Sequence, residues 1–388
     1  MIIGITTESS LNETRVALTP ANVAALAAKG ISVLIEAGAG DNAGFNDDGY
    51  TQAGATICPT QQDVIERSNI LVQVNAAPLA QSKLLLKSQW LIGMMDPLGE
   101  PQVIADLAQQ GVCGIAMELI PRISRAQNMD VLSSMATIAG YKSVLLAANF
   151  SARIFPMMMT AAGTLNPARL FVMGAGVAGL QAAAAAKRLG AVVEAYDVRP
   201  AARDQILSVG AKPIELALET SSAEGQGGYA KEQGEEFLIR QRELMSEVLA
   251  QQDIVITTAA IPGAKSPVLI TKEMVAQMKP GAVIIDLASE RGGNCELTEH
   301  AKTVVCHGVT IVGPENITTS VANHASQLYG KNIENLLSLM SDEDGALSLD
   351  FDDQIIQETV VCDQGQVCSA RIRELLKLAP LAIDEEVA

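Results

Sequence analysis

The chain has 388 residues, which at roughly 150 residues per domain suggests two or three domains. Hydrophobic residues make up 48% of it and aromatic residues only 3%, so its cores must be built mainly from aliphatic side chains. A net charge of −17 argues against a general surface for nucleic acid or for an anionic membrane, because both need clustered Lys and Arg. Any anionic ligand must therefore be held locally, by backbone N–H groups or a few bases.

The cysteines and histidines are scattered. The six cysteines include no C-x-x-C pair, so free thiols of a reducing compartment are expected. The three histidines lack the spacing of metal ligands, so no metal site is predicted. The apolar runs fall short of the ~18 residues that a membrane span needs, and the N-terminus lacks the basic region and cleavage site of a signal peptide.

The first third of the chain alternates between strand and helix patterns. Helices are expected at 20–29 and 101–110, ended by Gly30 and Gly111 as a left-handed C-cap requires. Alternation of this kind is typical of an α/β fold with a mainly parallel sheet. The expected strands are 1–6, 31–36, 70–74, 89–95 and 112–117.

The segment 121–167 is rich in Ala, Ser and Met and is expected to be helical. A second strand–helix alternation follows, with a Gly- and Ser-rich loop at 221–229. Its expected strands are 169–173, 191–196, 253–258, 282–286 and 310–313, and its helices are 177–189 and 231–250. After residue 320, a helix at 327–340 and short strands at 347–351 and 359–361 are expected.

This order predicts two Rossmann-like, doubly wound parallel-sheet domains with a cleft between them. The first domain is expected to comprise 1–133 and 322–388, and the second, 134–321, to be inserted into it. The return of the chain to the first domain after about residue 320 is the least constrained part of this prediction.

A G-x-G-x-x-G motif lies between the strand 169–173 and an Ala-rich helix. In this context Gly174 allows a tight turn, Gly176 lets the backbone approach a pyrophosphate, and Gly179 lets helix and strand pack closely. The helix N-terminus at Val177 and Ala178 would then hold the anion through its N–H groups and dipole. The motif therefore predicts a dinucleotide site, which is also the way in which an acidic protein could bind such a ligand.

Asp197 ends the next strand, 23 residues after Gly174, where the acid that binds the adenosine ribose belongs. A 2′-phosphate there would meet like charge, at a cost of roughly 4 kcal/mol per charge at ~4 Å and an effective dielectric of ~20. NAD(H) is therefore predicted over NADP(H). Arg199 could serve a 2′-phosphate, but we expect it to point outward or to stack on adenine. The same cleft is expected to be bordered by Val198, Thr258, Ala259 and Leu287.

Several motifs carry a resemblance that covers nearly the whole chain. The opening Asn12–Pro20, the segment Ile261–Pro267 and the strand Val283–Ala288 resemble the family of alanine dehydrogenase and the NAD(H)-binding component of proton-translocating nicotinamide nucleotide transhydrogenase. An alanine dehydrogenase needs proton-transfer groups, and the family places a Lys and a His for them. Here Gln73 stands at the position of the Lys, and the strand 91–97 has no His.

The segment Pro121–Ser134 is similar, nearly letter for letter, to the transhydrogenase branch. The resemblance implies that Arg122, Gln127, Asp130 and Ser133 line the nicotinamide pocket, with Gln127 bridging to the incoming NADP(H). It also implies that Gly228 and Tyr229 belong to a lid that closes on NAD(H). Asn128, where the branch has Ser, and Gln73 depart from its pattern, and sequence does not assign their roles.

The resemblance implies a Re/Si-specific hydride transfer from NADH, bound here, to NADP⁺ on a partner subunit. It implies a homodimer, peripheral to the cytoplasmic face of the inner membrane, that docks on NADP(H)-binding and membrane-spanning subunits, with proton translocation as a property of the assembly. Two rival hypotheses remain: a soluble amino-acid dehydrogenase, and a non-enzymatic NAD-sensing or scaffold module.

Overall fold

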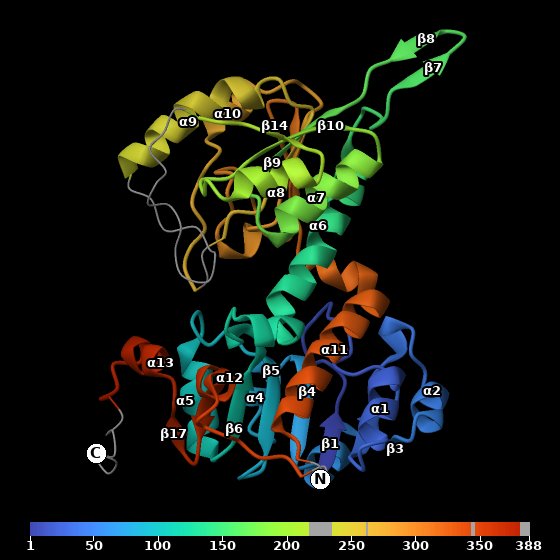
Figure 1. Cartoon of the computed structure of the whole chain (residues 1–388), viewed down its shortest axis with the longest axis vertical. Helices are drawn as coiled ribbons and strands as arrows, with labels where there is room; N and C mark the ends of the chain where they lie inside the picture. Colours follow the sequence, from blue (N-terminus) through green and yellow to red (C-terminus); the bar gives the residue numbers. More distant parts are fainter. Residues whose placement is uncertain (217–234, 261–262, 343–345, 381–388) are drawn as a thin grey trace. The chain divides into compact units, whose positions relative to one another are not determined.

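The computed structural model of the chain describes residues 1–216, 235–260, 263–342 and 346–380 (Figure 1). The chain divides into two compact units, which are described separately below. Unit 1 comprises Met1–Met135 and Thr319–Ala388, and unit 2 comprises Ala136–Thr318. Each unit is built around one mostly parallel sheet covered by helices, which confirms the predicted fold class.

The sheet of unit 1 has the strand order β3-β2-β1-β4-β5-β6-β16-β17. Its first six strands are parallel and follow the 3-2-1-4-5-6 order of a doubly wound fold, whereas β16 and β17 add an antiparallel edge. The strands are β1 (Ile2–Ile5), β2 (Ser32–Glu36), β3 (Thr56–Cys58), β4 (Ile70–Asn75), β5 (Trp90–Met94), β6 (Cys113–Ala116), β16 (Val360–Asp363) and β17 (Gln366–Val367).

Proline and glycine residues mark where helices of unit 1 begin and end. Pro101 stands in the first turn of α5, and Gly111 ends that helix in the left-handed region at φ 72°. Apolar side chains of the strands alternate between two cores, one on each face of the sheet. The helices are α1 (Pro20–Ala27), α2 (Asp47–Gln52), α3 (Gln61–Arg67), α4 (Ala77–Gln81), α5 (Pro101–Gln110), α11 (Ala322–Met340), α12 (Gln354–Thr359) and α13 (Ala370–Leu375).

The main sheet of unit 2 repeats the same order, as β11-β10-β9-β12-β13-β15, with β14 antiparallel at its edge. Its central strands are almost wholly buried and therefore read as continuous apolar runs. The elements are β9 (Arg169–Met173), β10 (Val192–Tyr196), β11 (Lys212–Pro213), β12 (Ile254–Thr257), β13 (Val283–Asp286), β14 (Lys302–Cys306), β15 (Val309–Gly313), α7 (Val177–Arg188), α8 (Ala202–Ser208), α9 (Glu235–Leu249) and α10 (Lys272–Ala276).

Helix α6 (Val131–Phe150) begins in unit 1 and ends in unit 2. Val131 belongs to a core of unit 1, and Val144 and Ala147 belong to a core of unit 2. With 20 residues, and a mean hydropathy of 1.4 over its most apolar window, α6 is the one described helix long and apolar enough to cross a membrane. Core helices of soluble proteins meet the same criterion, so this feature is weak support for a span. The apolar runs in the sequence did not predict it, because polar residues interrupt them.

Two expected elements are wrong. The segment 151–167 is not helical: it forms an antiparallel hairpin of β7 (Met158–Thr160) and β8 (Gly163–Leu165) that projects from unit 2 (Figure 1). Pro156 removes a helical N–H, and Gly163, at φ 134°, adopts a backbone conformation that a helix cannot contain. The expected strand at 347–351 is reduced to an isolated bridge at Leu347, because its polar residues lead directly into α12.

Candidate functional site

The residues predicted to bind a dinucleotide in unit 2 lie at one edge of its sheet. Strand register places Met173 beside Tyr196 and Thr257, and Thr257 beside Asp286. The residues that follow these strand ends are therefore neighbours at the carboxyl edge, where doubly wound sheets bind ligands. They are Gly174 after β9, Asp197 after β10, Thr258 after β12 and Leu287 after β13.

The three glycines of the motif differ in what surrounds them. A Cβ on Gly179 would lie 1.8 Å from the carbonyl oxygen of Gly174, so α7 can pack against β9 only without a side chain there. Gly174 has φ 99°, and its Cβ would lie 2.6 Å from Thr258 Oγ1. A Cβ on Gly176, in contrast, would meet no atom of the described residues within 4 Å. Protein packing accounts for Gly174 and Gly179, whereas Gly176 borders open space that a ligand could occupy.

The N-terminus of α7 is suited to an anion. Gly176 is its N-cap, and its first turn carries no acidic residue, while Lys187 and Arg188 lie in its last turn. The helix has 12 residues, so its dipole and its unpaired N–H groups favour negative charge near Val177 and Ala178. Val177 is exposed and Ala178 is partly buried. This end of the helix can therefore accept a phosphate without a basic side chain.

Asp197 is already bonded to the protein. Its Oδ2 accepts the N–H of Ala175 at 2.7 Å. The backbone N, Nε and Nη2 of Arg199 donate to the same carboxylate at 2.8–2.9 Å. The expectation that Arg199 points outward is wrong, because its side chain is only 15% exposed and folds back on Asp197. The paired guanidinium offsets the charge of Asp197, so repulsion of a 2′-phosphate is weaker than the sequence alone predicts.

A buried asparagine, Asn294, fixes the rim of the site, which is the backbone at Thr258 and Ala259 after β12. Asn294 Oδ1 accepts the N–H of Ala259 at 3.0 Å, and its Nδ2 donates to the carbonyl of Ala259 at 2.8 Å. Thr258 Oγ1 in turn donates to the carbonyl of Gly174 at 2.9 Å. Hydrogen bonds between protein groups thus link the loops that follow β9 and β12. Gly228 and Tyr229, the predicted lid, lie outside the described residues.

In unit 1, the predicted nicotinamide segment contains a short 3₁₀ helix, η3 (Ser124–Met129). Ala126 and Met129 are buried in the core, so Gln127 and Asn128 between them face solvent. The carbonyl of Asn128 accepts hydrogen bonds at 2.8 and 2.9 Å from Asn332 and Asn335 of α11. Gln127 is therefore an exposed amide on a fixed turn, and the departure at Asn128 leaves these backbone contacts intact.

Asp130 caps helix α6. Its Oδ1 accepts the N–H of Ser133 at 2.8 Å and its Oδ2 accepts the Ser133 hydroxyl at 2.6 Å. Arg122 lies next to this pair, with Nε 3.9 Å from Asp130 Oδ2 and its side chain 30% exposed. The structure thus brings together Arg122, Asp130 and Ser133, three of the four residues that the resemblance selects. Their hydrogen bonds also serve the helix N-terminus.

The carboxyl edge of the unit 1 sheet holds partly buried acids instead of an amine. Gln73 is 1% exposed, and its Nε2 donates to Thr6 Oγ1 at 2.7 Å. Glu8 accepts two backbone N–H groups at the end of β4, at 2.6 and 3.1 Å, and burial raises its pKa to about 8. Glu118 accepts two N–H groups after β5, and burial raises its pKa to about 7. Both carboxyl groups are turned toward strand ends, which they cap.

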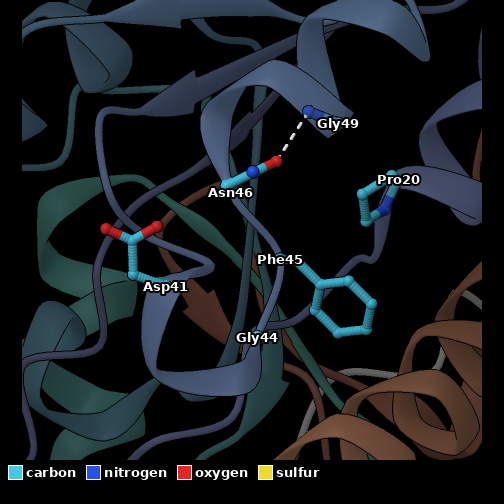
Figure 2. A pocket seen from close by; sticks show the side chains of 6 residues that line it. All are labelled: Pro20, Asp41, Gly44, Phe45, Asn46 and Gly49. Carbon is cyan, nitrogen blue, oxygen red and sulfur yellow. Dashed lines mark hydrogen bonds between the residues drawn. The ribbon is translucent and has the colours of Figure 1, made fainter.

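A separate hollow of about 430 Å³ lies in unit 1 (Figure 2). Its one ionisable side chain is an exposed carboxylate, that of Asp41, and none of the residues predicted for the site lines it. Asn46 accepts the N–H of Gly49 at 3.0 Å and so caps α2 at its border. The hollow has no basic group for a nucleotide phosphate. Its lining residues are Pro20, Asp41, Gly44, Phe45, Asn46 and Gly49.

The chain is similar to known proteins over nearly its whole length. A protein from Rhodospirillum rubrum, named as the first part of NAD(P) transhydrogenase subunit alpha, is 46% identical over 374 residues, covering 95% of this chain and 97% of that protein. NAD(P) transhydrogenase subunit alpha from Haemophilus influenzae is 40% identical, covering 100% of this chain and 77% of that protein. A solved transhydrogenase structure from Sinorhizobium meliloti superposes with a TM-score of 0.85 at 44% identity, over 95% of this chain and 100% of that one.

Family models cover both portions of the sequence. Residues 4–139 match the model described as alanine dehydrogenase/PNT, N-terminal domain. Residues 143–370 match the model described as alanine dehydrogenase/PNT, C-terminal domain. The chain therefore belongs to the alanine dehydrogenase/PNT family, as its sequence motifs predicted.

Proposed function

We propose that this chain is the NAD(H)-binding subunit of a proton-translocating nicotinamide nucleotide transhydrogenase. Two relatives with transhydrogenase names, at 46% and 40% identity over at least 95% of this chain, support the assignment. The observation that carries it is the open space at Gly176, at the N-terminus of α7, because no contact with the part of the chain that the structure describes accounts for the missing side chain. A dinucleotide phosphate that approaches this backbone does account for it.

The residues of unit 2 would hold the cofactor at the carboxyl edge of the sheet. The N–H groups of α7 would receive the pyrophosphate, and Asp197 would receive the adenosine ribose once Arg199 shifts. Thr258, Ala259 and Leu287 would form the opposite rim. We further propose that Val198 contacts the adenosine, and that Gly228 and Tyr229 close over it.

In unit 1, we propose that the exposed amide of Gln127 and the Arg122–Asp130–Ser133 group orient the nicotinamide carboxamide. An amide both donates and accepts, so Gln127 can bridge two partners. When bound, NADH supplies a hydride to NADP⁺ held on a partner subunit. Both reacting rings are nicotinamides, so no proton must leave the reacting carbons, and proximity, orientation and exclusion of water suffice. Gln73, an amide in place of an amine, cannot supply the proton transfer that an alanine dehydrogenase needs.

We propose that the chain acts as a homodimer, peripheral to the cytoplasmic face of the inner membrane through its partner subunits. The β7–β8 hairpin supports the dimer, because all of its residues are exposed and they include Met158, Met159 and Leu165. A projecting apolar hairpin of this kind needs a covering surface to be stable in water. A second copy of the chain could supply one. Coupling to proton translocation would belong to the whole assembly.

The test is reconstitution with a purified NADP(H)-binding partner. Hydride transfer from NADH to a thionicotinamide analogue of NADP⁺ is followed by absorbance, with each protein alone as a control. Transfer that requires both proteins is the expected result. NADH binding without transfer, but with L-alanine-dependent reduction of NAD⁺, would establish an amino-acid dehydrogenase instead. NADH binding with neither activity would indicate a sensor or scaffold module.

The variant Gln127→Asn is measured in the same assay. It shortens the amide by one methylene, so transfer should fall at least about tenfold, as misplacement of reacting groups by about 1 Å can cost more than that. Gln102→Asn is the matched control, because Gln102 is an exposed amide on α5 that bonds Asp106 at 2.9 Å. Equal rates for Gln127→Asn and the wild type would remove Gln127 from the proposal.

A further inference from the structure

A buried carboxylate lies behind the rim of the unit 2 site. Asp286 ends β13 and is 0% exposed. Its two oxygens accept five hydrogen bonds, all from uncharged donors, at 2.7–3.1 Å. One donor is the hydroxyl of Thr257 on β12, and the others belong to the loop 288–298. Gly293, at φ 80°, leaves room for the carboxylate, because a Cβ on Gly293 would lie 2.7 Å from Asp286 Oδ2.

The loop that Asp286 organises carries Asn294. Asp286 Oδ2 accepts the backbone N–H of Asn294 at 2.8 Å. The fully buried side chain of Asn294 then pairs with both the N–H and the carbonyl of Ala259, and donates to Pro267 O at 2.9 Å. Thr258, the residue before Ala259, bonds the carbonyl of Gly174. A continuous series of hydrogen bonds thus runs from β13 to the glycine turn.

We propose that Asp286 and Asn294 are positioning residues for the cofactor site, which hold the rim at Ala259 in its binding geometry before the cofactor arrives. The inference rests on the proposed binding of NAD(H) at this edge. Neither side chain needs to touch the cofactor, since both are fully buried. A fixed rim lowers the ordering cost of binding, because the backbone at Ala259 is already held by hydrogen bonds to Asn294. Charge-assisted bonds to a buried carboxylate suit that task.

The experiment compares NADH dissociation constants, from fluorescence titration of the full chain, with thermal stability. Asn294→Ala should weaken NADH binding about tenfold, as expected for a rim that has lost its hydrogen bonds. Asp286→Asn should weaken it in the same direction. Gln252→Ala is the matched control: it removes a buried amide that bonds Glu194 and Val248 near the amino end of β12, away from the carboxyl edge. It should cost similar stability but leave NADH affinity within about twofold.

A second measurement uses the wild type alone. Because Ala259 N–H is bonded to Asn294, its amide should be protected from hydrogen exchange before NADH is added. In the reconstituted complex, the loss in Asn294→Ala should fall on KM for NADH, with kcat within about twofold. Wild-type affinity in Asn294→Ala, an equal loss in Gln252→Ala, or an Ala259 amide protected only when NADH is present would each overturn the inference. A wild type that binds no NADH would instead overturn the proposed function.

Discussion

Substitution of two glycines in one motif separates binding from stability. Among the residues described, none would come within 4 Å of the Cβ of Gly176→Ala, and the φ of −75° at this position suits any residue. Alanine is a poorer N-cap residue than glycine, which destabilises the fold, but it also restricts the unfolded chain, which stabilises the fold. These two effects oppose each other, so the free energy of unfolding should change by less than about 1 kcal/mol. The new methyl group would, however, stand where a pyrophosphate approaches the backbone.

The expected loss of NADH affinity follows from the hydrogen bonds between the phosphate and the backbone N–H groups. A methyl group that keeps the phosphate from even one N–H removes a charge-assisted hydrogen bond, which is worth about 1.5–3 kcal/mol. NADH affinity should therefore fall at least about tenfold. The assays are denaturant unfolding and calorimetric titration with NADH, on the same preparations.

Gly179→Ala is the matched partner of this variant. Its Cβ would lie 1.8 Å from Gly174 O, although real Cβ contacts are essentially never closer than 3.0 Å. Helix α7 must therefore move away from β9 by about 1 Å, an overpacking that costs about 1–3 kcal/mol or more of unfolding free energy. Wild-type NADH affinity in Gly176→Ala would refute the assignment of the open space to a pyrophosphate. Unchanged stability in Gly179→Ala would refute the packing argument.

Three further outcomes are expected. Asp197→Ala should raise affinity for NADP⁺ relative to NAD⁺ at least about tenfold, because it frees Arg199 for a 2′-phosphate; an unchanged ratio in parallel titrations would contradict the ribose assignment. Glu8 keeps its proton up to about pH 8 in the folded state but loses it near 4.5 when unfolded, so stability should fall as pH rises through that window. Glu8→Gln should flatten this fall in thermal unfolding measured from about pH 5 to 8, and a slope equal to that of the wild type would sink the argument. Met159→Lys, at a side chain 76% exposed on the hairpin, should shift the chain from dimer to monomer in light scattering, whereas a persistent dimer would place the interface elsewhere.

Structural features that depend only on residues close together in the sequence could be predicted. The motif at Gly174 sets its own turn and helix start, and Asp197 follows at a fixed distance because one helix and one strand intervene. Alternating strand and helix patterns likewise indicated the fold class, since the period of apolar residues depends only on the element that contains them. Short or polar elements such as β3 and β14 were not predicted, because too few residues define their period.

The choice of side-chain partners was decided by the tertiary structure. Arg199 turns onto Asp197 because the buried carboxylate is a better partner than solvent, and no spacing rule states that preference. Asn294 reaches Ala259, 35 residues away, only because β12 and β13 are neighbours in the sheet. The sequence by itself determined most of the longer elements and the glycine turn. The folded chain decided which side chains hold that turn in place, because those contacts depend on strand order and burial.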